Sequence, residues 1–282
     1  LDNVLLNNFV LQSITIAIDG PSPYSKINLQ RKRRATMVYD DLDIHKLNSL
    51  HLTPGTKFMI NLTKHVKSYI STRKKWFRYR NVKFNFSPTT LPDEGELKVF
   101  NKLIQNGKNN IDSSHLVVGN DADLVVMAMA LHDIYDIDIL IKNRKVYDTV
   151  QIKRLLEIFA EKCSIPTNSI LYKQSLRQDF AVISILMGND YLPKLSFIKY
   201  DTIWDSYINT KKLTHEFLTK DSNLNMKFFK NMLENIVLTL PKQFKTINLN
   251  AYVQYGEQHI QNYLEGLVWC LQMYEYGKCY MY

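Results

Sequence analysis

The first half of the chain alternates between short apolar runs and longer segments in which apolar residues recur at helical spacing. The runs are rich in β-branched residues and bounded by Gly, Asn or Asp, and therefore predict strands over residues 14–18, 82–86, 116–118 and 137–141. Helical patterns separate them over residues 25–39, 56–71, 94–104 and 122–131. This alternation predicts an α/β fold with a mostly parallel central sheet flanked by helices.

The second half of the chain has few strand signals. Its apolar residues recur at helical spacing over residues 150–159, 180–187, 228–238 and 263–274. We expect a mainly helical region over residues 143–282, packed on an α/β core of residues 1–142, because no Gly-, Ser- or Pro-rich linker separates the two. The sequence lacks the run of about 18 apolar residues that a membrane span needs, so we expect no membrane partner.

The charge of the chain indicates a polyanionic partner. The 282 residues contain 36 Lys and Arg against 27 Asp and Glu, which gives a net charge of +9. By charge alone, nucleic acid is the first candidate for such a partner and an acidic membrane surface the second, and of the two we expect nucleic acid. The sequence indicates no protein partner.

The cysteines and the two ends of the chain bear on its compartment and completeness. Cys163, Cys270 and Cys279 show neither Cys-X-X-Cys spacing nor a His at ligand distance, which disfavours a disulfide framework and a zinc site. We therefore expect an intracellular protein, cytoplasmic or nuclear. The chain opens at Leu1 without a starting Met or a signal-peptide pattern and stops at Tyr282, so we expect both ends to be truncated.

Carboxylates follow the predicted strands and one apolar helix. In an open α/β sheet, ligands bind at the carboxyl ends of the strands, where these side chains would gather. Clustered carboxylates repel one another unless cations neutralise them, and oxygen ligands alone suit Mg²⁺ or Mn²⁺. Two such ions about 4 Å apart can activate water and stabilise the leaving oxygen of a phosphodiester. The candidate catalytic and metal-binding residues are Asp19, Glu94, Glu96, Asp121, Asp123 and Asp190.

Each of these acids also has a structural interpretation. Glu94 and Glu96 can be first-turn residues that the helix dipole favours, Asp121 can be a helix N-cap, and Asp190 can be a turn residue. For any single residue, the structural interpretation is at least as good. The similar placement of all of them after apolar elements favours the metal site.

A basic stripe follows Asp19 directly. On a helix, Lys26, Gln30, Arg33 and Arg34 lie at i, i+4, i+7 and i+8, which is one face. All four side chains are good donors to phosphate oxygens, so a terminal phosphate bound here would lie near the metals. The alternative is a solvated basic face or a nuclear localisation run.

These residues resemble the Xrn-type 5′→3′ exoribonucleases in order and spacing across nearly the whole chain. The matching segments are Ile18-Asp19-Gly20 through Lys26, Gln30, Arg33 and Arg34; Leu52-Thr53-Pro54-Gly55-Thr56-Lys57-Phe58-Met59; Phe86-Ser87 with Glu94-Gly95-Glu96-Leu97-Lys98; Gly119-Asn120-Asp121-Ala122-Asp123-Leu124; Asp179-Phe180 with Gly188-Asn189-Asp190-Tyr191-Leu192-Pro193; and Tyr263-Leu264-Glu265-Gly266-Leu267 with Trp269. Any one motif is weak, whereas the ordered set is specific.

The resemblance implies a 5′-nuclease, PIN-like core and a Mg²⁺- or Mn²⁺-dependent enzyme with two ions. Such an enzyme degrades single-stranded RNA from a 5′-monophosphate and releases mononucleotides. The six carboxylates named above would be the ligands. Lys26, Gln30, Arg33 and Arg34 would form a 5′-phosphate pocket too small for a cap or a triphosphate.

The chain also departs from the family pattern. The family's usual Gly before the first Glu is Asp93 here, and its usual His after the second Glu is Leu97. The family carries a further metal-binding Asp on its first strand, a base-stacking His and a C-terminal aromatic partner. We expect this chain to lack them because of its truncated ends.

Two other functions stay open. A flap-type structure-specific 5′ nuclease shares the carboxylate chemistry and could prefer DNA. A non-catalytic RNA-binding scaffold is the alternative from another class. Among the remaining residues, Asp179 can support the metal ligands or be a helix N-cap, and we favour the N-cap. Lys98 can orient Glu94 or Asp93 or be a lysine of the helix surface, and we favour the role in the site. We interpret His115 as the start of a strand.

Overall fold

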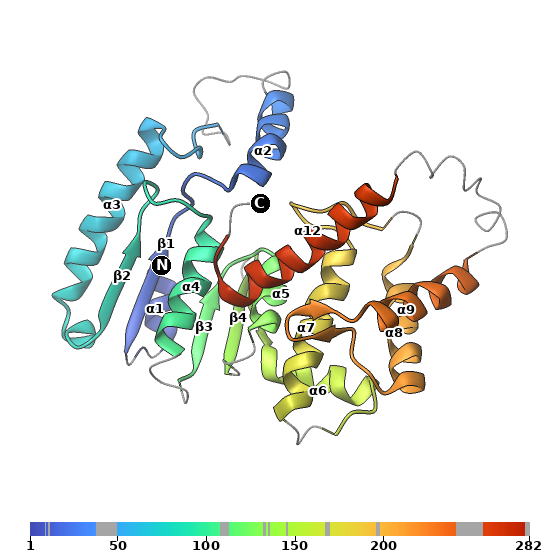
Figure 1. Cartoon of the computed structure of the whole chain (residues 1–282). Coiled ribbons are helices and arrows are strands. Elements are labelled where there is room, and N and C mark those ends of the chain that lie inside the picture. Colours follow the sequence, from blue (N-terminus) through green and yellow to red (C-terminus); the bar gives the residue numbers. More distant parts are fainter. Residues whose placement is uncertain are drawn as a thin grey trace. The chain divides into compact units, whose positions relative to one another are not determined.

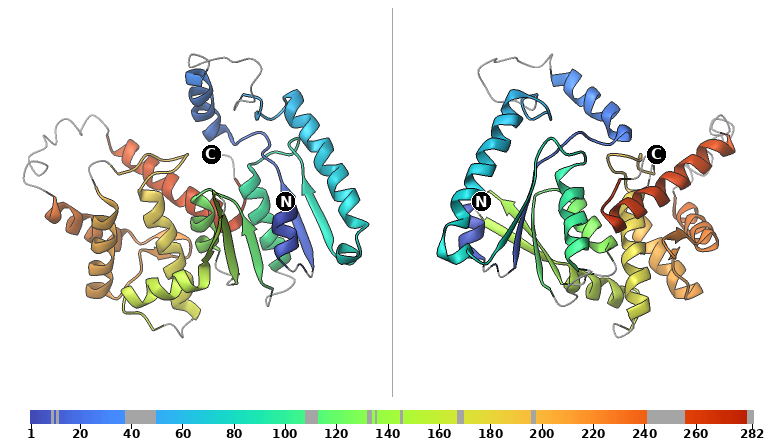
Figure 2. Two further views of the ribbon diagram at one scale, coloured as in Figure 1. Left: turned by 180° about the vertical axis from the view of Figure 1, so that it is seen from behind. Right: turned by 60° about the vertical axis from the view of Figure 1, so that its left-hand side comes forward.

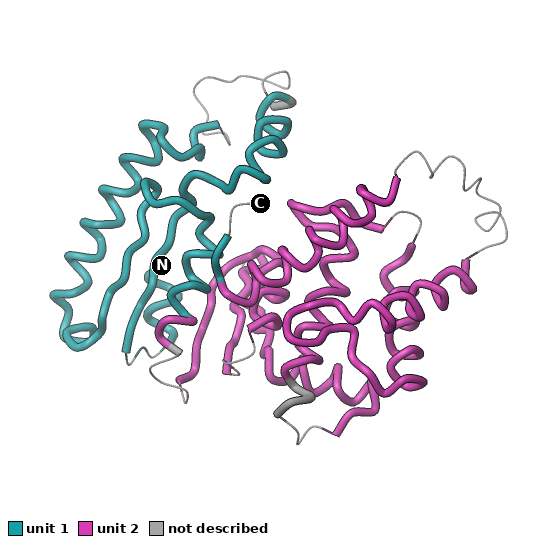
Figure 3. Tube along the Cα trace, in the orientation of Figure 1, with its two compact units in different colours: residues 1–103, 277–282 teal, residues 104–276 magenta. Residues whose placement is uncertain are grey.

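The computed structural model describes residues 1–8, 10, 12–37, 50–107, 113–131, 134, 136–144, 146–166, 170–195, 198–240 and 256–279. It divides into two compact units (Figure 3). Unit 1 comprises Leu1–Leu103 with Gly277–Tyr282, and unit 2 comprises Ile104–Tyr276. Among the described helices, none is both long and apolar enough to cross a membrane.

Unit 1 is built on two parallel strands. β1 (Ser13–Ala17) pairs with β2 (Lys83–Ser87) in the register Ser13 to Lys83 and Ala17 to Ser87. The other elements that begin in this unit are α1 (Asp2–Asn7), α2 (Tyr24–Met37), α3 (Lys57–Lys74), the 3-10 helix η1 (Phe77–Tyr79) and α4 (Gly95–Gly107) (Figure 1). The predicted strands and helices of this region are therefore present, whereas α1 was not predicted.

α3 shows how local sequence fixes these elements. The Thr56 hydroxyl accepts a hydrogen bond from the Met59 backbone N–H, which caps the helix N-terminus. Met59, Thr63 and Ile70 are buried at spacings of four and seven residues, and α3 packs against β2. Leu5 of α1 and Tyr79 of η1 belong to a small core cluster, and the Tyr79 hydroxyl donates to the Leu5 carbonyl over 3.2 Å.

Unit 2 contains a three-stranded sheet and most of the helices. β3 (His115–Val118) pairs in parallel with β4 (Ile137–Asn143), which pairs antiparallel with β5 (Val146–Gln151). The remaining elements are α5 (Asp123–Ala130), α6 (Ile152–Lys162), α7 (Ile170–Leu186), α8 (Tyr200–Thr214), the hairpin β6 (Thr219–Lys220) and β7 (Asn223–Leu224), α9 (Met226–Thr239) and α12 (Glu257–Tyr276). α7 packs against both α5 and α12 (Figure 2).

The predicted α/β fold is confirmed in its coarser form, as a mixed fold with helices beside small sheets. β3 begins at His115 as predicted. The described strands form sheets of two, three and two strands, in which β1 with β2 and β3 with β4 pair in parallel and the other two pairs are antiparallel. The expectation of a helix from residue 150 was wrong at its start: Val150 belongs to β5, where it pairs with Ile139, and the helix begins at Ile152. The division into domains at residues 142 and 143 stays a prediction.

Three consecutive polar residues of α7 are buried, and each bonds a different element. Arg177 donates to the carbonyls of Ala128 and Met129, over 2.7 and 3.0 Å, and so caps the C-terminus of α5. Gln178 donates to Glu275 of α12 over 3.2 Å. Asp179 accepts hydrogen bonds from the hydroxyl of Tyr207 in α8 and from the backbone of the β6 hairpin.

The interpretation of Asp179 as an N-cap is therefore wrong. The helix starts at Ile170, so that Asp179 lies in its interior and is fully buried. The apolar run that suggested a start at Phe180 is only the last part of the helix, because the three buried positions directly before it, 177–179, are polar. Burial raises the pKa of Asp179 from 3.8 to about 6, against the hydrogen bonds from Thr219 and Tyr207, which lower it.

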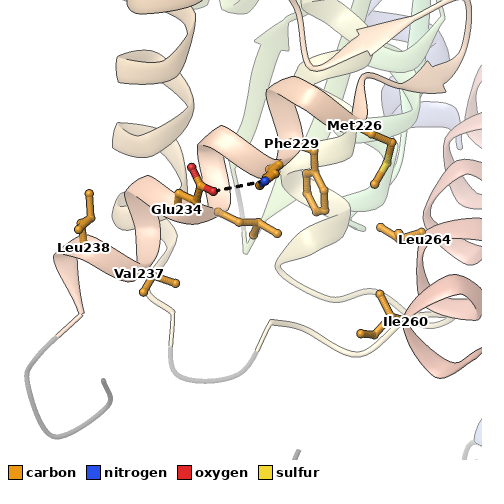
Figure 4. A pocket seen from close by; sticks show the side chains of 9 residues that line it. Met226, Phe229, Glu234, Val237, Leu238, Ile260 and Leu264 are labelled. Atoms are coloured by element: carbon orange, nitrogen blue, oxygen red, sulfur yellow. Dashed lines mark ion pairs between the residues drawn. The ribbon is translucent and has the colours of Figure 1, made fainter. Parts of the chain in front are cut away.

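An apolar pocket of about 840 Å³ lies between α9 and α12 (Figure 4). Its lining includes Phe229, Val237 and Leu238 from α9, and Ile260 and Leu264 from α12. None of its lining residues is among the predicted site residues. The predicted chemistry therefore lies elsewhere in the fold.

Candidate active site

Asp19 lies just beyond the end of β1, where the sequence predicts a ligand. Its Oδ1 atom accepts a hydrogen bond from the backbone N–H of Gly95, over 2.7 Å. Gly95 is the first residue of α4, so the positive end of the helix dipole favours the charged carboxylate. A Cβ at Gly20 would lie 1.7 Å from the Leu91 carbonyl oxygen, so that only glycine fits the turn after Asp19.

Lys26 of the predicted phosphate-binding face contacts the predicted ligand Glu94. The Lys26 Nζ atom lies 2.6 Å from Oε1 and 2.8 Å from Oε2 of Glu94. The two side chains are only 14% and 15% exposed, so solvent screens this pair less than a surface pair. Two residues spaced 68 positions apart in the sequence are thus brought into contact, which the sequence did not predict.

The other residues of the basic stripe lie along α2. Arg34 Nη2 donates to Gln30 Oε1 over 2.9 Å, and Gln30 in turn donates to the Ser22 hydroxyl. Gln30 and Arg34 are half-buried, whereas Arg33 is exposed. The bonds of Gln30 to Ser22 and Arg34 hold the polar groups of Gln30 and Arg34 along one side of α2.

Lys98 holds the ends of both strands beside Asp19. Its Nζ atom donates to the carbonyls of Ile18, over 2.8 Å, and Pro88, over 3.0 Å. Burial lowers the pKa of Lys98, while the charges of Asp19 and Asp93 act in the opposite direction. Lys98 therefore holds the backbone at the ends of β1 and β2, next to Asp19.

Asp93 occupies a backbone conformation that favours glycine. Its φ angle is 78°, in the left-handed region, and its carbonyl accepts from the Gly20 N–H over 2.9 Å. The next two acids follow from this turn: Glu94 precedes α4 directly, and Glu96 is the second residue of the helix. The departure from the family pattern at this position therefore falls on a turn that glycine would adopt more easily.

In unit 2, Asp121 and Asp123 follow β3. The Oδ1 atom of Asp121 accepts from the Asp123 backbone N–H over 3.1 Å, at the start of α5. Asn120 Oδ1 accepts from the Lys142 N–H over 2.9 Å and so ties this loop to β4. Asp121 is exposed and Asp123 is half-buried. Asp121 thus accepts a backbone N–H at the start of α5 and is otherwise exposed to solvent.

Tyr274 connects Asp123 to the turn that carries Asp190. The Tyr274 hydroxyl donates to Asp123 Oδ2 over 3.4 Å and accepts from Asn189 Nδ2 over 3.2 Å. Asn189 Oδ1 accepts from the backbone of the residues after Asp190, which fixes the turn. Sequence reasoning missed Tyr274 because 151 positions separate it from Asp123, and only the aromatic motif on the same helix pointed to this region.

The donor chemistry of these residues fits a hard divalent cation, because every predicted ligand is a carboxylate. Over the described part of the chain, however, no three His, Cys, Asp or Glu residues are grouped as a metal site. In unit 1, the Lys26 ammonium lies against both oxygens of Glu94, where it neutralises the carboxylate. That all six carboxylates bind metal ions in one centre stays a prediction.

Comparisons with known proteins point to RNA-degrading exonucleases. Residues 39–142 match the family model described as the XRN 5′-3′ exonuclease N-terminus. The chain is 24% identical to human 5′-3′ exoribonuclease 1 over 77% of its own length and 15% of that protein. It is 24% identical to 5′-3′ exoribonuclease 2 of Arabidopsis thaliana, over 75% of this chain and 28% of that protein.

Over a shorter stretch of the chain, the sequence identity to another relative is higher. Over 43% of this chain, the identity to 5′-3′ exoribonuclease 2 of Schizosaccharomyces pombe is 32%, and the match covers 15% of that protein. The chain thus spans less than a third of the length of each of these relatives.

Proposed function

Because the chain is related to the Xrn-type 5′→3′ exoribonucleases, we propose that the protein degrades 5′-monophosphorylated single-stranded RNA to mononucleotides. The contact between Lys26 and Glu94 carries this proposal. It joins a helix of phosphate donors to a carboxylate that directly precedes α4. A 5′-terminal phosphate bound to α2 would therefore lie beside the acidic residues that follow β1 and β2.

In this proposal the carboxylates would hold Mg²⁺ or Mn²⁺ as two ions. Such ions supply an activated water and stabilise the leaving oxygen of a phosphodiester. The proposed ligands are Asp19, Glu94 and Glu96 in unit 1 and Asp121, Asp123 and Asp190 in unit 2. The protein contributes the N–H of Gly95 at Asp19 and the hydroxyl of Tyr274 at Asp123, which hold these carboxylates in place.

The phosphate donors of α2 would select the 5′ end. The proposed residues are Lys26, Gln30, Arg33 and Arg34, whose amino, amide and guanidinium groups donate to phosphate oxygens. The ammonium group of Lys26 would donate hydrogen bonds to both the phosphate and Glu94. Because the two groups would share one cation, binding of the 5′ end would be coupled to the acidic site.

The fold supports this assignment. The parallel pairing of β1 with β2 and of β3 with β4 is the pairing expected of a 5′-nuclease, PIN-like core with a mostly parallel sheet. The region after residue 142, which is mainly helical in the described residues, would be the helical segment that follows this core. We propose both as parts of a longer nuclease.

Substrate choice tests the proposal against its alternatives. The purified protein would be incubated with Mn²⁺ and three substrates: 5′-monophosphate RNA, 5′-triphosphate RNA and flap DNA. We expect mononucleotides from the first substrate alone, resolved by anion-exchange chromatography, and none in EDTA. Cleavage of flap DNA alone would identify a structure-specific nuclease, and RNA binding without hydrolysis would identify a scaffold.

A further inference from the structure

The positive charge of the chain is concentrated in one segment outside the candidate site. Between Lys57 and Lys83 there are nine Lys and Arg residues and no Asp or Glu, so this segment carries a charge of +9. The whole chain also carries +9, because the other residues contribute 27 bases (36 − 9) and 27 acids. The segment comprises α3, η1 and the first residue of β2.

The lysines of α3 form one exposed stripe. At about 100° per residue, Lys57, Lys64, Lys67, Lys74 and the following Lys75 lie within about 100° of the helix circumference. All five are exposed. At about 1.5 Å per residue the stripe is roughly 27 Å long, which is enough to contact several successive phosphates. Among the described carboxylates, none forms an ion pair with these five lysines.

Exposed aromatic rings adjoin the C-terminal end of this stripe. Phe77 is 78% exposed and Trp76 is 40% exposed. The Arg80 guanidinium lies 4.2 Å from the centre of the Phe77 ring, and the Arg73 guanidinium lies 4.0 Å from the Trp76 ring. Arg73 is itself held by an ion pair to Asp2. Aromatic rings and stacked guanidinium planes beside cations are the groups on which unpaired bases stack.

This surface is separate from the site for the 5′ end. η1 precedes β2 and Glu94 follows it, so the aromatic residues and the carboxylates lie at opposite ends of the two-stranded sheet. Five residues of β2 correspond to roughly 17 Å. Figure 1 shows α3 along the outer side of β2, and so the stripe runs beside the strand that leads to the site.

We propose that α3 and η1 form a second binding surface for single-stranded RNA, apart from the residues that bind the 5′ end. The lysine stripe would take phosphates, and Phe77 and Trp76 would stack bases. The choice of RNA as the polyanion rests on the proposed function. An anionic membrane fits less well, because the apolar residues Met59 and Ile70 of α3 are buried instead of facing outward as in an interfacial helix.

Binding of an RNA that the 5′-phosphate residues do not select tests this surface. The probe is a fluorescent 20-nucleotide RNA with a 5′-hydroxyl, titrated in EDTA at several salt concentrations. The variant carries Lys64→Glu, Lys67→Glu and Lys74→Glu, and a second variant carries Phe77→Ala. The control carries Lys153→Glu, Lys162→Glu and Lys212→Glu, which changes the net charge equally on exposed lysines of α6 and α8.

We expect the α3 triple variant to bind at least tenfold more weakly. The slope of log affinity against log salt is negative, and it should become shallower by about 2, at about 0.7 per lost phosphate contact. Phe77→Ala should weaken binding about tenfold with an unchanged salt slope, because stacking is not ionic. Equal losses in the control and the α3 variant, or unchanged binding in the α3 variant, would overturn the proposal. Tighter binding of phosphatidylserine vesicles than of RNA would also overturn it.

Hydrolysis separates this inference from the proposed function. A 5′-phosphorylated RNA of two nucleotides is shorter than the roughly 17 Å of β2 alone, so it cannot reach from Glu94 to Phe77. We expect the α3 triple variant to cleave it at the wild-type rate in Mn²⁺. If the wild type cleaves no RNA but the α3 variant still loses binding, the proposed function fails and the binding surface stands.

Discussion

The hydroxyl of Tyr274 lies 3.4 Å from Oδ2 of Asp123, and it also accepts a hydrogen bond from Asn189. A buried tyrosine thus fixes the carboxylate at the first residue of α5. Groups that orient metal ligands through such bonds commonly change metal affinity when they are removed.

Tyr274→Phe should therefore weaken Mn²⁺ binding by about tenfold without unfolding the chain. Isothermal titration calorimetry measures the affinity, and thermal unfolding checks the fold. Tyr263→Phe on the same helix is the matched control, because its hydroxyl contacts only the Pro193 carbonyl among the bonds described. An equal loss of affinity in both variants would assign the effect to the helix as a whole.

Asp121→Ala should abolish hydrolysis of 5′-monophosphate RNA while leaving RNA affinity nearly unchanged. The carboxylate is proposed to act through the metal, and it is exposed, so that the fold should tolerate its loss. The release of mononucleotides over time measures hydrolysis, and the fluorescence anisotropy of labelled RNA in EDTA measures RNA affinity. Wild-type turnover in this variant would remove Asp121 from the proposed ligands.

Lys26→Met should erase most of the preference for a 5′-monophosphate over a 5′-hydroxyl end. The substitution keeps the length of the side chain but removes the ammonium that lies against Glu94. It also leaves Glu94 without this cation, so we expect Mn²⁺ to bind severalfold more tightly. The preference is measured by mixing 5′-monophosphate RNA with 5′-hydroxyl RNA and comparing the rates at which the two are degraded. Lys32→Met, on an exposed position of α2, serves as the control.

Asp93→Gly should stabilise the protein by roughly 0.5–1 kcal/mol. The φ angle of 78° costs an aspartate about 1–3 kcal/mol, part of which the larger entropy of an unfolded glycine offsets. Chemical unfolding measures the free energy change. Asp148→Gly in β5 provides the contrast, because glycine weakens a strand that has ordinary backbone angles.

Stability should fall with rising pH because of Asp179. Its pKa is about 6 in the folded protein and near 3.8 in the unfolded chain, so the folded state binds the proton more tightly. The stabilising contribution is complete below pH 4 and is lost as the pH rises through 6, a change of the order of 3 kcal/mol at about 1.4 kcal/mol per pKa unit. Asp179→Asn should remove this part of the pH dependence, measured by urea unfolding between pH 4 and pH 8. An unaltered pH profile would contradict the assignment.

The sequence predicted those parts of the site that lie next to regular elements. Asp19 and Glu94 were found because each follows an apolar strand, and Lys26 because a basic stripe replaced the apolar face of a helix. In unit 1, Lys26 contacts Glu94, and the roles of both residues in phosphate and metal binding stay predictions. The resemblance to the Xrn-type family is confirmed by the comparisons.

Tertiary packing decided what the sequence did not show. Tyr274 looks like any core aromatic until its hydroxyl is seen beside Asp123. Asp179 was misplaced at a helix start because its burial depends on partners from α8 and β6, which no local pattern reveals. β5 was missed because most of its side chains are exposed, so it lacks the apolar alternation that marks a strand.

The concentration of charge between Lys57 and Lys83 has a kinetic consequence. The other residues sum to zero charge, so this segment equals the net charge of the chain, and together with the five bases of α2 it supplies a positive long-range field. An approaching polyanion would be drawn to α3 as well as to the end-binding residues of α2, so a strand can be held before its end is recognised. Capture would then begin in the interior of a strand, and its rate should decline steeply as salt is added, whereas a search for the free end would follow as a slower, less salt-sensitive step.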